Sequence, residues 1–325
     1  LWKRIQKQRV DLTLFSEKIQ ELKDRIASVI VGQEQTVDLV LTAILANGHV
    51  LIEGVPGVAK TLLARLTARL IDADFSRVQF TPDLMPSDVL GTTVFNMKTN
   101  GFDFHQGPIF ADIVLVDEIN RAPAKTQAAL FEVMEERQIS IDGTTHRMGD
   151  LYTILATQNP VEQEGTYKLP EAQLDRFLMK ITMDYPSLEE EVNILERHHT
   201  NAALVKLDDI TPAITKEELL SLRAFMNQVF VDRTLLQYIA LIVQQTRTSK
   251  AVYLGASPRA SVAMLQSSKA YALLQGRDFV TPEDIKFVAP YVLQHRLILT
   301  AEAEMEGYSP VKVTQRLIDK VEVPK

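Results

Sequence analysis

Cysteine is absent from this chain of 325 residues, so the protein can form neither disulfide bonds nor thiolate metal sites. No apolar run approaches the roughly 18 residues that a membrane-spanning helix requires. Acidic side chains outnumber Lys and Arg by 42 to 35, and the net charge of −7 argues against broad electrostatic binding to nucleic acid. These absences predict a cytoplasmic protein without membrane insertion.

The first residues, LWKRIQKQRVDL, are basic and lack both an initiating Met and the apolar core of a signal peptide. We therefore expect the chain to start inside a longer native sequence. Its length exceeds the usual size of a single hydrophobic core and predicts one to three domains.

The stretch GVPGVAKT, Gly54 to Thr61, lies between the apolar run HVLIEG and the helix-like segment TLLARLTARLI. Phosphates are held by backbone N–H groups at a helix start, so this position and its glycines predict a phosphate-binding loop. By the motif G-x-x-x-x-G-K-[ST], Lys60 would contact the outer phosphates of a nucleotide and the Thr61 hydroxyl would bind Mg²⁺. The predicted nucleotide-binding residues of this loop are Gly54, Val55, Pro56, Gly57, Val58, Ala59, Lys60, Thr61 and Leu62.

The loop departs from the motif at Ala59, which occupies the position of the second glycine. An alanine is expected there only if its φ is negative, because left-handed backbone favours glycine. A Gly/Pro turn between a strand and a helix that binds nothing is the alternative interpretation of the whole stretch.

A second signal is the run DIVLVDEIN, residues 112–120, an apolar stretch that leads into Asp117 and Glu118. Such runs are typical of buried parallel strands, whose carboxyl ends face the ligand crevice. Asp117 is therefore predicted to hold Mg²⁺ through its water shell, and Glu118 to be the base that polarises a water toward the γ-phosphorus. Alternatively, the two carboxylates form an exposed strand end that caps the next helix.

Hydrophobic periodicity changes near Pro186. Before this residue, helical patterns alternate with strand-like runs, which predicts an α/β domain with a mostly parallel sheet over 1–188. The strand-like runs lie at 49–53, 77–80, 113–116, 152–156 and 178–183, and the first helical patterns at 13–29 and 33–46. Beyond Pro186 we expect a helical domain over 189–325, because only helical periodicity is found there. Its helical patterns lie at 187–199, 215–230, 232–248, 258–275, 282–297 and 310–321.

Two segments that interrupt the α/β pattern are predicted to be hairpins. Residues 86–109 contain two β-prone pieces around Asn100-Gly101, a strong turn signal, and residues 138–148 have Asp142-Gly143 at the turn. Both could be surface hairpins without a function, or their aromatic rings could pack within the hairpin segment itself. The aromatic candidates for contact with a polypeptide are Phe95, Phe102 and Phe104.

With both phosphate-site motifs in view, the chain resembles the MoxR family of AAA+ ATPases over nearly its whole length. The stretches that carry the resemblance are GVPGVAKT, LVDEINRAPAKTQAALFEVMEE, ILATQNPVEQEGTYKLPEAQLDRF, GASPRA and HRLILTAEAEMEGYSPVKV. The resemblance implies a P-loop AAA+ domain with a parallel sheet, a helix-2 insert and a pre-sensor hairpin at the two predicted hairpins, and an all-helical C-terminal lid domain. Ala59 is common in this family.

The resemblance also assigns roles to two polar residues. Asn159, at the end of LYTILATQN, matches sensor 1, whose amide orients the attacking water or contacts the γ-phosphate. Without the family, Asn159 with the following proline is simply a turn. Arg176 matches the arginine finger, which acts in trans on the next subunit's nucleotide. The alternative for Arg176 is an ion pair with Asp175 or Glu171.

Further nucleotide contacts follow from the resemblance. Arg259 matches sensor 2, carried by the helical domain and lying over the nucleotide as a lid, but it could also be a solvated residue in a first helical turn. Val31 and Gly32, which follow Ile30, fall where family members pack the adenine base. An apolar interdomain turn would have the same sequence.

The function implied by the resemblance is Mg²⁺-dependent hydrolysis of ATP by a homo-oligomeric ring, expected to be a hexamer. The ring would remodel client polypeptides or insert cofactors into them. Family members commonly work with proteins that carry a von Willebrand factor A domain, so we expect such a partner.

Other functions stay open at this point. A DNA motor or loader should line its pore with Lys and Arg, whereas the two hairpins carry only Lys98 and Arg147 beside Asp103 and Asp142, so nucleic acid is an unexpected partner. The set of catalytic candidates is intact, which argues against a nucleotide-gated scaffold with little turnover. A GTP switch would need an Asn-Lys-x-Asp stretch, which the sequence lacks.

Overall fold

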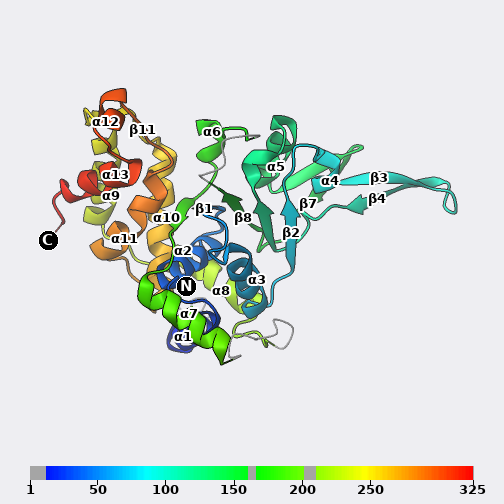
Figure 1. The fold of residues 1–325 in the computed structure, drawn as a ribbon, viewed down its shortest axis with the longest axis horizontal. Helices are drawn as coiled ribbons and strands as arrows, with labels where there is room; N and C mark the ends of the chain where they lie inside the picture. The colour runs from blue at the N-terminus through cyan, green and yellow to red at the C-terminus, as the bar shows by residue number, and fades with distance from the viewer. Residues whose placement is uncertain (1–11, 160–165, 201–209, 325) are drawn as a thin grey trace, which may run out of the picture.

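The computed structural model describes residues 12–159, 166–200 and 210–324, and its centre is a five-stranded parallel sheet (Figure 1). The strand order is β2-β5-β8-β1-β9, so β1, which leads into the phosphate loop, lies between β8 and β9. The strands are β1 (Val50–Gly54), β2 (Phe75–Gln79), β5 (Ile113–Asp117), β8 (Thr153–Gln158) and β9 (Met179–Met183). The predicted parallel sheet is thereby confirmed.

Alternating side chains of the strands belong to two separate core layers, because successive residues of a strand point to opposite faces. Ile113 and Leu115 of β5 pack with the helices α1, α2 and α3, whereas Val114 and Val116 pack with α5 on the other face. These helices are α1 (Leu12–Val29), α2 (Glu34–Leu45), α3 (Lys60–Leu70) and α5 (Ala124–Glu136), with the short turn η2 (Ile119–Arg121) before α5. Burial on both faces is the reason that the strands appear in the sequence as continuous apolar runs.

Both predicted hairpins are present. The first, β3 (Gly91–Asn96) with β4 (Gly101–Gln106), follows the short helix α4 (Pro86–Leu90) and extends away from the body in Figure 1. The second pairs β6 (Gln138–Ile141) with β7 (Thr144–Arg147). At its turn Asp142 and Gly143 have φ of +49° and +79°, the two positive values that a type I′ turn requires. The Thr93 hydroxyl donates to Asp142 Oδ2 at 2.6 Å and thereby joins the two hairpins.

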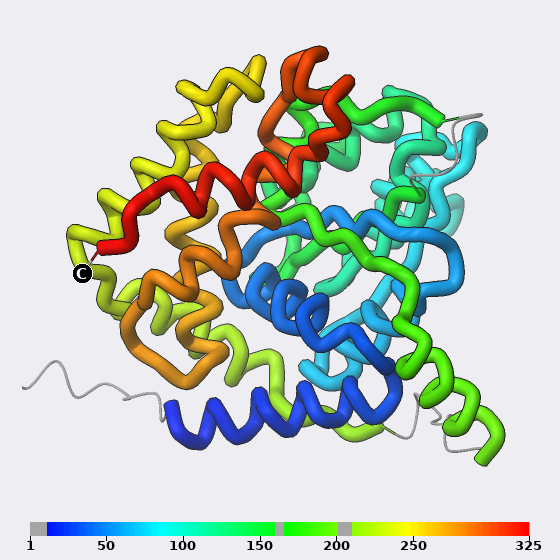
Figure 2. Tube along the Cα trace, turned by 60° about the vertical axis from the view of Figure 1, so that its left-hand side comes forward, coloured from blue at the N-terminus to red at the C-terminus, as the bar shows by residue number. Residues whose placement is uncertain are grey.

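The part of the chain after β9 is mainly helical. Its elements are α7 (Leu188–His199), α8 (Lys216–Phe225), η4 (Met226–Gln228), α9 (Arg233–Thr248), β10 (Val252–Leu254), α10 (Pro258–Leu274), α11 (Pro282–Leu293), β11 (Ile298–Leu299), α12 (Ala301–Met305) and α13 (Pro310–Asp319). In Figure 2 the orange α11 and the red α13 lie beside one another. Among the described residues, no helix combines the length and apolarity needed to cross a bilayer.

One element of this part differs from the prediction of helices alone. The strands β10 and β11 pair antiparallel, with Val252 opposite Leu299. Strands of three and two residues are too short to show a period of two, so the sequence pattern could not distinguish them from helix connections.

The division into domains at residue 188 stays a prediction. The helix α7 starts at that residue, but α8 returns to the sheet, where Lys216 Nζ lies 2.5 Å from Asp112 Oδ1 and Arg223 donates to Asn47 Oδ1 at 2.8 Å. The helix α10 also packs against α2, and buried residues of both belong to one continuous core layer. The helical part is therefore held on the sheet by apolar packing as well as by the chain connection.

Candidate functional site

The carboxyl ends of β1, β2, β5 and β8 surround a pocket of about 440 Å³. Ligands bind at this edge of a parallel sheet because the loops after the strands leave a crevice there. Its lining residues are Pro56, Gly57, Ala59, Lys60, Thr61, Leu62, Arg77, Gln79, Asp117, Glu118, Thr157 and Asn159. The structure thus brings Lys60, Thr61, Asp117, Glu118 and Asn159 together from three separate stretches of sequence.

The phosphate loop joins β1 to α3, which begins at Lys60. Lys60 Nζ donates to the carbonyl oxygens of Gly54 and, at 3.3 Å, of Val55. Gly57 has a φ of +89°, and no atom lies within 4 Å of the position that a Cβ would take there. The middle of the loop is therefore open toward a ligand.

Ala59 has a φ of +60°, so the expectation of a negative φ at this position is wrong. Left-handed backbone costs an L-residue about 1–2 kcal/mol. The conformation lets the Ala59 carbonyl accept the hydrogen bond from Leu63 N at 2.9 Å at the start of α3. Alanine thus occupies the glycine position of the motif at this conformational cost.

Three of the predicted loop residues do not line the pocket. Val58 is buried in the core beneath the sheet, and Val55 packs against that core. Gly54 ends β1, where a Cβ would lie 2.7 Å from the carbonyl oxygen of Met183. The side chains of Val55 and Val58 anchor the loop to the core, and the predicted nucleotide contacts of these three residues stay a prediction.

Asp117 and Glu118 are held at the end of β5 by the neighbouring strand β8. Thr157 Oγ1 of β8 donates to Asp117 Oδ1 at 3.1 Å and accepts from the Glu118 backbone N–H at 3.0 Å. Glu118 has a left-handed backbone with φ of +55°. Strained backbone of this kind persists where surrounding contacts impose it, often at functional sites. Thr157 thus fixes the orientation of both carboxylate residues.

Two residues of β2 also reach the pocket, and sequence reasoning missed them. Arg77 Nε lies 2.6 Å from Asp117 Oδ2, and Gln79 Nε2 donates to Glu118 Oε2 at 2.7 Å. Because β2 pairs with β5, Gln79 is directly opposite Asp117. The spacing of two between Arg77 and Gln79 places them on one face of a strand, but only the strand order shows which residues they meet.

The donor set of the pocket fits a nucleotide phosphate with Mg²⁺. Lys60 and the amino end of α3 supply positive charge and N–H donors for phosphate oxygens. The Thr61 hydroxyl and the Asp117 carboxylate supply the oxygen ligands that Mg²⁺ prefers while it keeps several waters. Within the described ranges, no group of three or more His, Asp or Glu residues could hold a metal by itself. Magnesium in this pocket would therefore depend on phosphate oxygens and water as further ligands.

Arg176 and Arg259 lie outside this pocket, and both meet Glu135 in the last turn of α5. Arg259 NH2 is 3.2 Å from Glu135 Oε1, and Arg176 Nε is 3.8 Å from Glu135 Oε2. Glu135 lies eleven residues beyond Ala124, the first residue of α5, which is about 16 Å along a helix. Arg259 is at this position because α10 begins beside the far end of α5. Its predicted role over the nucleotide stays a prediction.

The sequence left open an ion pair of Arg176 with Asp175 or Glu171. In the structure, Arg176 and Asp175 have other partners. Asp175 Oδ1 lies 2.7 Å from Arg296 Nε. Arg176 instead donates to the carbonyl oxygen of Phe131, one turn before Glu135 on α5. Arg176 is therefore held against α5 at some distance from the phosphate pocket.

Comparison with known proteins decides the family. Residues 49–179 match the family model described as "ATPase family associated with various cellular activities (AAA)", and residues 244–319 match that of the AAA lid domain. The chain is 44% identical over 309 residues to the chaperone MoxR1 of Mycobacterium tuberculosis, covering 92% of this chain and 81% of that protein. The chain belongs to the MoxR family of AAA+ ATPases.

Other relatives agree with this assignment. The uncharacterised protein YeaC of Bacillus subtilis is 47% identical over 301 residues, which is 93% of each chain. A crystal structure of a proposed ATPase from Cytophaga hutchinsonii superposes with a TM-score of 0.88 at 40% identity and covers 97% of each chain. These matches confirm the predicted fold class, an AAA+ domain followed by a lid.

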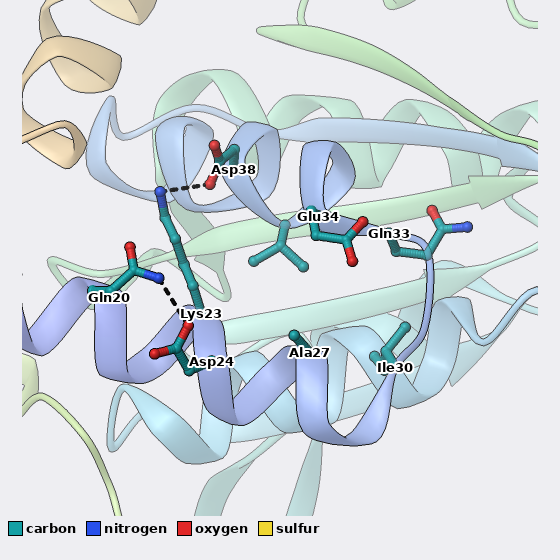
Figure 3. Close-up of a pocket in the computed structure, with 9 residues that line it drawn as sticks. Gln20, Lys23, Asp24, Ala27, Ile30, Gln33, Glu34 and Asp38 are labelled. Atoms are coloured by element: carbon teal, nitrogen blue, oxygen red, sulfur yellow. Dashed lines mark hydrogen bonds and ion pairs between the residues drawn. The ribbon is translucent and has the colours of Figure 1, made fainter. Parts of the chain in front are cut away.

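The part of this MoxR-family chain expected to pack the adenine base is separate from the phosphate pocket. Gly32 has a φ of +72°, and a Cβ there would lie 2.3 Å from Glu190 Oε1, so the first turn of α7 closes on this turn. Ile30 lines a second pocket of about 270 Å³ between α1 and α2, one end of which an ion pair closes (Figure 3). The assignment of Val31 and Gly32 to the base stays a prediction.

Proposed function

We propose that this MoxR-family protein hydrolyses ATP with Mg²⁺ as a ring of identical subunits, expected to be a hexamer, in which a neighbour completes each phosphate pocket. The separation of two parts of the site carries the proposal. Lys60, Thr61 and Glu118 share one pocket, whereas Arg176 is bound at the far end of α5. This separation supports a role for Arg176 at the pocket of another subunit.

Each residue of the pocket then has a distinct task. Lys60 donates to the outer phosphate oxygens, and Glu118 takes a proton from the water that attacks the γ-phosphorus in line. Asn159 orients that water through its amide. When bound by Thr61 and Asp117, Mg²⁺ neutralises charge on the phosphates.

The neighbouring subunit supplies the remaining positive charge. Arg176 would donate to the γ-phosphate oxygens, where charge develops during the reaction. We assign Arg259 to the same intersubunit position, since it contacts the same Glu135 carboxylate. Val31 and Gly32 keep their proposed role at the adenine base of their own chain.

A client polypeptide is the proposed substrate of the ring. Phe102 and Met97 are 74% and 88% exposed on the projecting first hairpin and offer apolar contact area with little specificity. Phe104 has another task, because its ring packs against Phe110 and His146, with centroids 5.8 and 4.3 Å apart. The relative from Mycobacterium tuberculosis is named a chaperone, which agrees with a client of this kind.

The charges of the hairpins favour a polypeptide over nucleic acid. Asp103 Oδ2 accepts from Asn96 and Asp142 Oδ2 accepts from Thr93, each at 2.6 Å, so carboxylates are built into both hairpins. Nucleic-acid backbones require the opposite charge. Cofactor insertion and a partner with a von Willebrand factor A domain complete the proposal, and they rest on the family resemblance. The proposed cytoplasmic location rests on the composition of the sequence.

Hydrolysis measured against protein concentration tests the proposal. The ATPase rate per subunit should rise with concentration as rings form, and Arg176→Ala should lower it about 10³- to 10⁵-fold. Arg147→Ala, on the second hairpin, is the matched control and should keep the wild-type rate. A rate per subunit that is independent of concentration, with Arg176→Ala as active as wild type, would contradict the intersubunit site. ATP binding without turnover at any concentration would instead support a nucleotide-gated scaffold.

A further inference from the structure

The carboxylate of Glu135 connects two parts of the chain. Its Oε1 lies 3.2 Å from NH2 of Arg259, at the start of α10, and its Oε2 lies 3.8 Å from Nε of Arg176, which precedes β9. Each carboxylate oxygen therefore faces a different guanidinium group. Two arginines that would repel each other are brought together by one negative charge between them.

The surroundings of Arg176 restrict its position from two sides. On one side, its NH1 donates to the Phe131 carbonyl oxygen of α5. On the other side, Arg296 of the lid is almost fully buried, pairs with Asp175 at 2.7 Å and donates to the Phe177 carbonyl oxygen at 2.6 Å. The backbone of Arg176 is thus held by the lid, while its guanidinium group is held by α5.

The contacts of Glu135 are too exposed to contribute much to folding. The side chains of Glu135 and Arg259 are 38% and 61% exposed, and exposed ion pairs contribute only about 0.2–1 kcal/mol. Glu135 also uses only part of each guanidinium group, which has five N–H donors in a fixed fork. The remaining donors of each fork can point to a phosphate while the carboxylate holds the pair in place.

We propose that Glu135 is a positioning residue that holds Arg176 and Arg259 as a pair, so that both meet the γ-phosphate bound by the neighbouring subunit. This inference rests on the proposed intersubunit site. It predicts that the loss of Glu135 acts as a defect of the surface that carries Arg176 and Arg259, the arginine face of a subunit, although Glu135 does not line the phosphate pocket.

Steady-state kinetics provide the first test. Glu135→Ala should lower kcat about ten- to hundredfold, because misplaced catalytic groups lose rate on that scale, while KM for ATP stays within about twofold. Glu135→Gln keeps the shape and one oxygen acceptor and should show a smaller loss of the same kind. Glu136→Ala changes the adjacent exposed carboxylate of α5 and is the matched control, with wild-type kcat expected.

Mixing of impaired subunits provides a second test, and its outcome distinguishes a positioning role of Glu135 from a merely structural one. Glu135→Ala mixed with Glu118→Gln should recover activity, since some interfaces then combine an intact pocket with an intact arginine face. Glu135→Ala mixed with Arg176→Ala should recover none, because both defects lie on the same face. The reference mixture is Arg176→Ala with Glu118→Gln, which the proposed function predicts to recover.

The outcomes separate the two proposals. If the reference mixture recovers but Glu135→Ala has wild-type kcat, or recovers activity with Arg176→Ala, the role of Glu135 is refuted while the intersubunit site stands. If the reference mixture does not recover, the intersubunit site fails and the role of Glu135 fails with it. If Glu135→Ala is unfolded by its melting temperature, the same mixtures made with Glu135→Gln decide the question.

Discussion

The phosphate pocket and the arginine cluster around Glu135 differ in how they are held. Asp117 is 6% exposed and is fixed by hydrogen bonds from β8 and β2, whereas Arg259 is largely exposed and is held by one carboxylate. Groups that act on a ligand of their own chain can be buried and oriented by folding alone. Groups that must reach another chain have to stay at the surface, where they need a partner that orients them.

This difference predicts where substitutions will act. If the proposed intersubunit site holds, a change in the pocket should remove chemistry that the chain contains by itself, and a change in the cluster should remove only its contribution to a neighbour. Stability should depend on the buried anchors of both regions and very little on the exposed pairs.

The largest effect is expected at Glu118. Glu118→Gln has the same shape but cannot take a proton from water, so turnover should fall about 10²- to 10⁴-fold with ATP affinity retained. Lys60→Ala should instead weaken ATP binding itself. Turnover and binding of a fluorescent nucleotide separate the two effects, with Glu136→Gln as the surface control. Wild-type turnover of Glu118→Gln would exclude Glu118 as the base.

A second effect concerns the anchor of α5 beneath the arginine cluster. His49 is buried, its Nε2 lies 3.1 Å from the Met134 carbonyl oxygen, and its Nδ1 accepts from Ile154 N at 2.9 Å. Burial, with the nearby Arg137 charge, lowers the pKa of His49 to about 3. His49 therefore stays neutral in the folded protein while the unfolded chain takes up a proton below pH 6.5.

The free energy of unfolding should consequently fall by about 2 kcal/mol between pH 6.5 and pH 5, and further toward pH 3. Denaturation in urea at several pH values measures this slope. His49→Gln cannot be protonated and should flatten the slope. A part of the slope, with the same sign, should remain, because burial also lowers the pKa of His295. His105→Gln, on the exposed side of the first hairpin, is the control substitution. An unchanged slope in His49→Gln would contradict this account.

The first hairpin permits a comparison within one element. Phe104→Ala should lower the free energy of unfolding by about 1–2 kcal/mol, since its ring is half-buried against Phe110 and His146. Phe102→Ala should leave the melting temperature and basal ATPase rate unchanged and reduce client-dependent effects, because that ring is exposed. A lowered melting temperature of Phe102→Ala would show that this ring instead packs within the first hairpin and stabilises its fold.

The smallest effect is expected at Ala59. Glycine adopts a φ of +60° without steric cost, so Ala59→Gly should raise the free energy of unfolding by at most about 1 kcal/mol, with the ATPase rate unchanged. Ala128→Gly, on the exposed face of α5, is the matched control and should destabilise by about 1 kcal/mol. Destabilisation of Ala59→Gly as large as that of Ala128→Gly would show that the left-handed backbone stores no strain.

Patterns within short stretches of sequence were sufficient for much of the fold. The apolar runs predicted all five sheet strands, and the Asn-Gly and Asp-Gly pairs predicted the two hairpins. The motifs at 54–61 and 112–120 predicted Lys60, Thr61, Asp117 and Glu118, which meet in the phosphate pocket, but not Arg77 and Gln79. Each of these signals is local, because burial on both faces of a strand, or a positive φ in a turn, selects residue types within a few positions.

Contacts between distant stretches were decided by the tertiary structure alone. Gln79 meets Glu118 only because β2 lies next to β5, and Arg259 meets Glu135 only because α10 begins beside the end of α5. The positive φ of Ala59 likewise depends on how β1 and α3 are placed around the loop. Periodicity in a sequence specifies which side chains are buried, but which elements face each other depends on the packing of the whole core, where no local pattern records the partner.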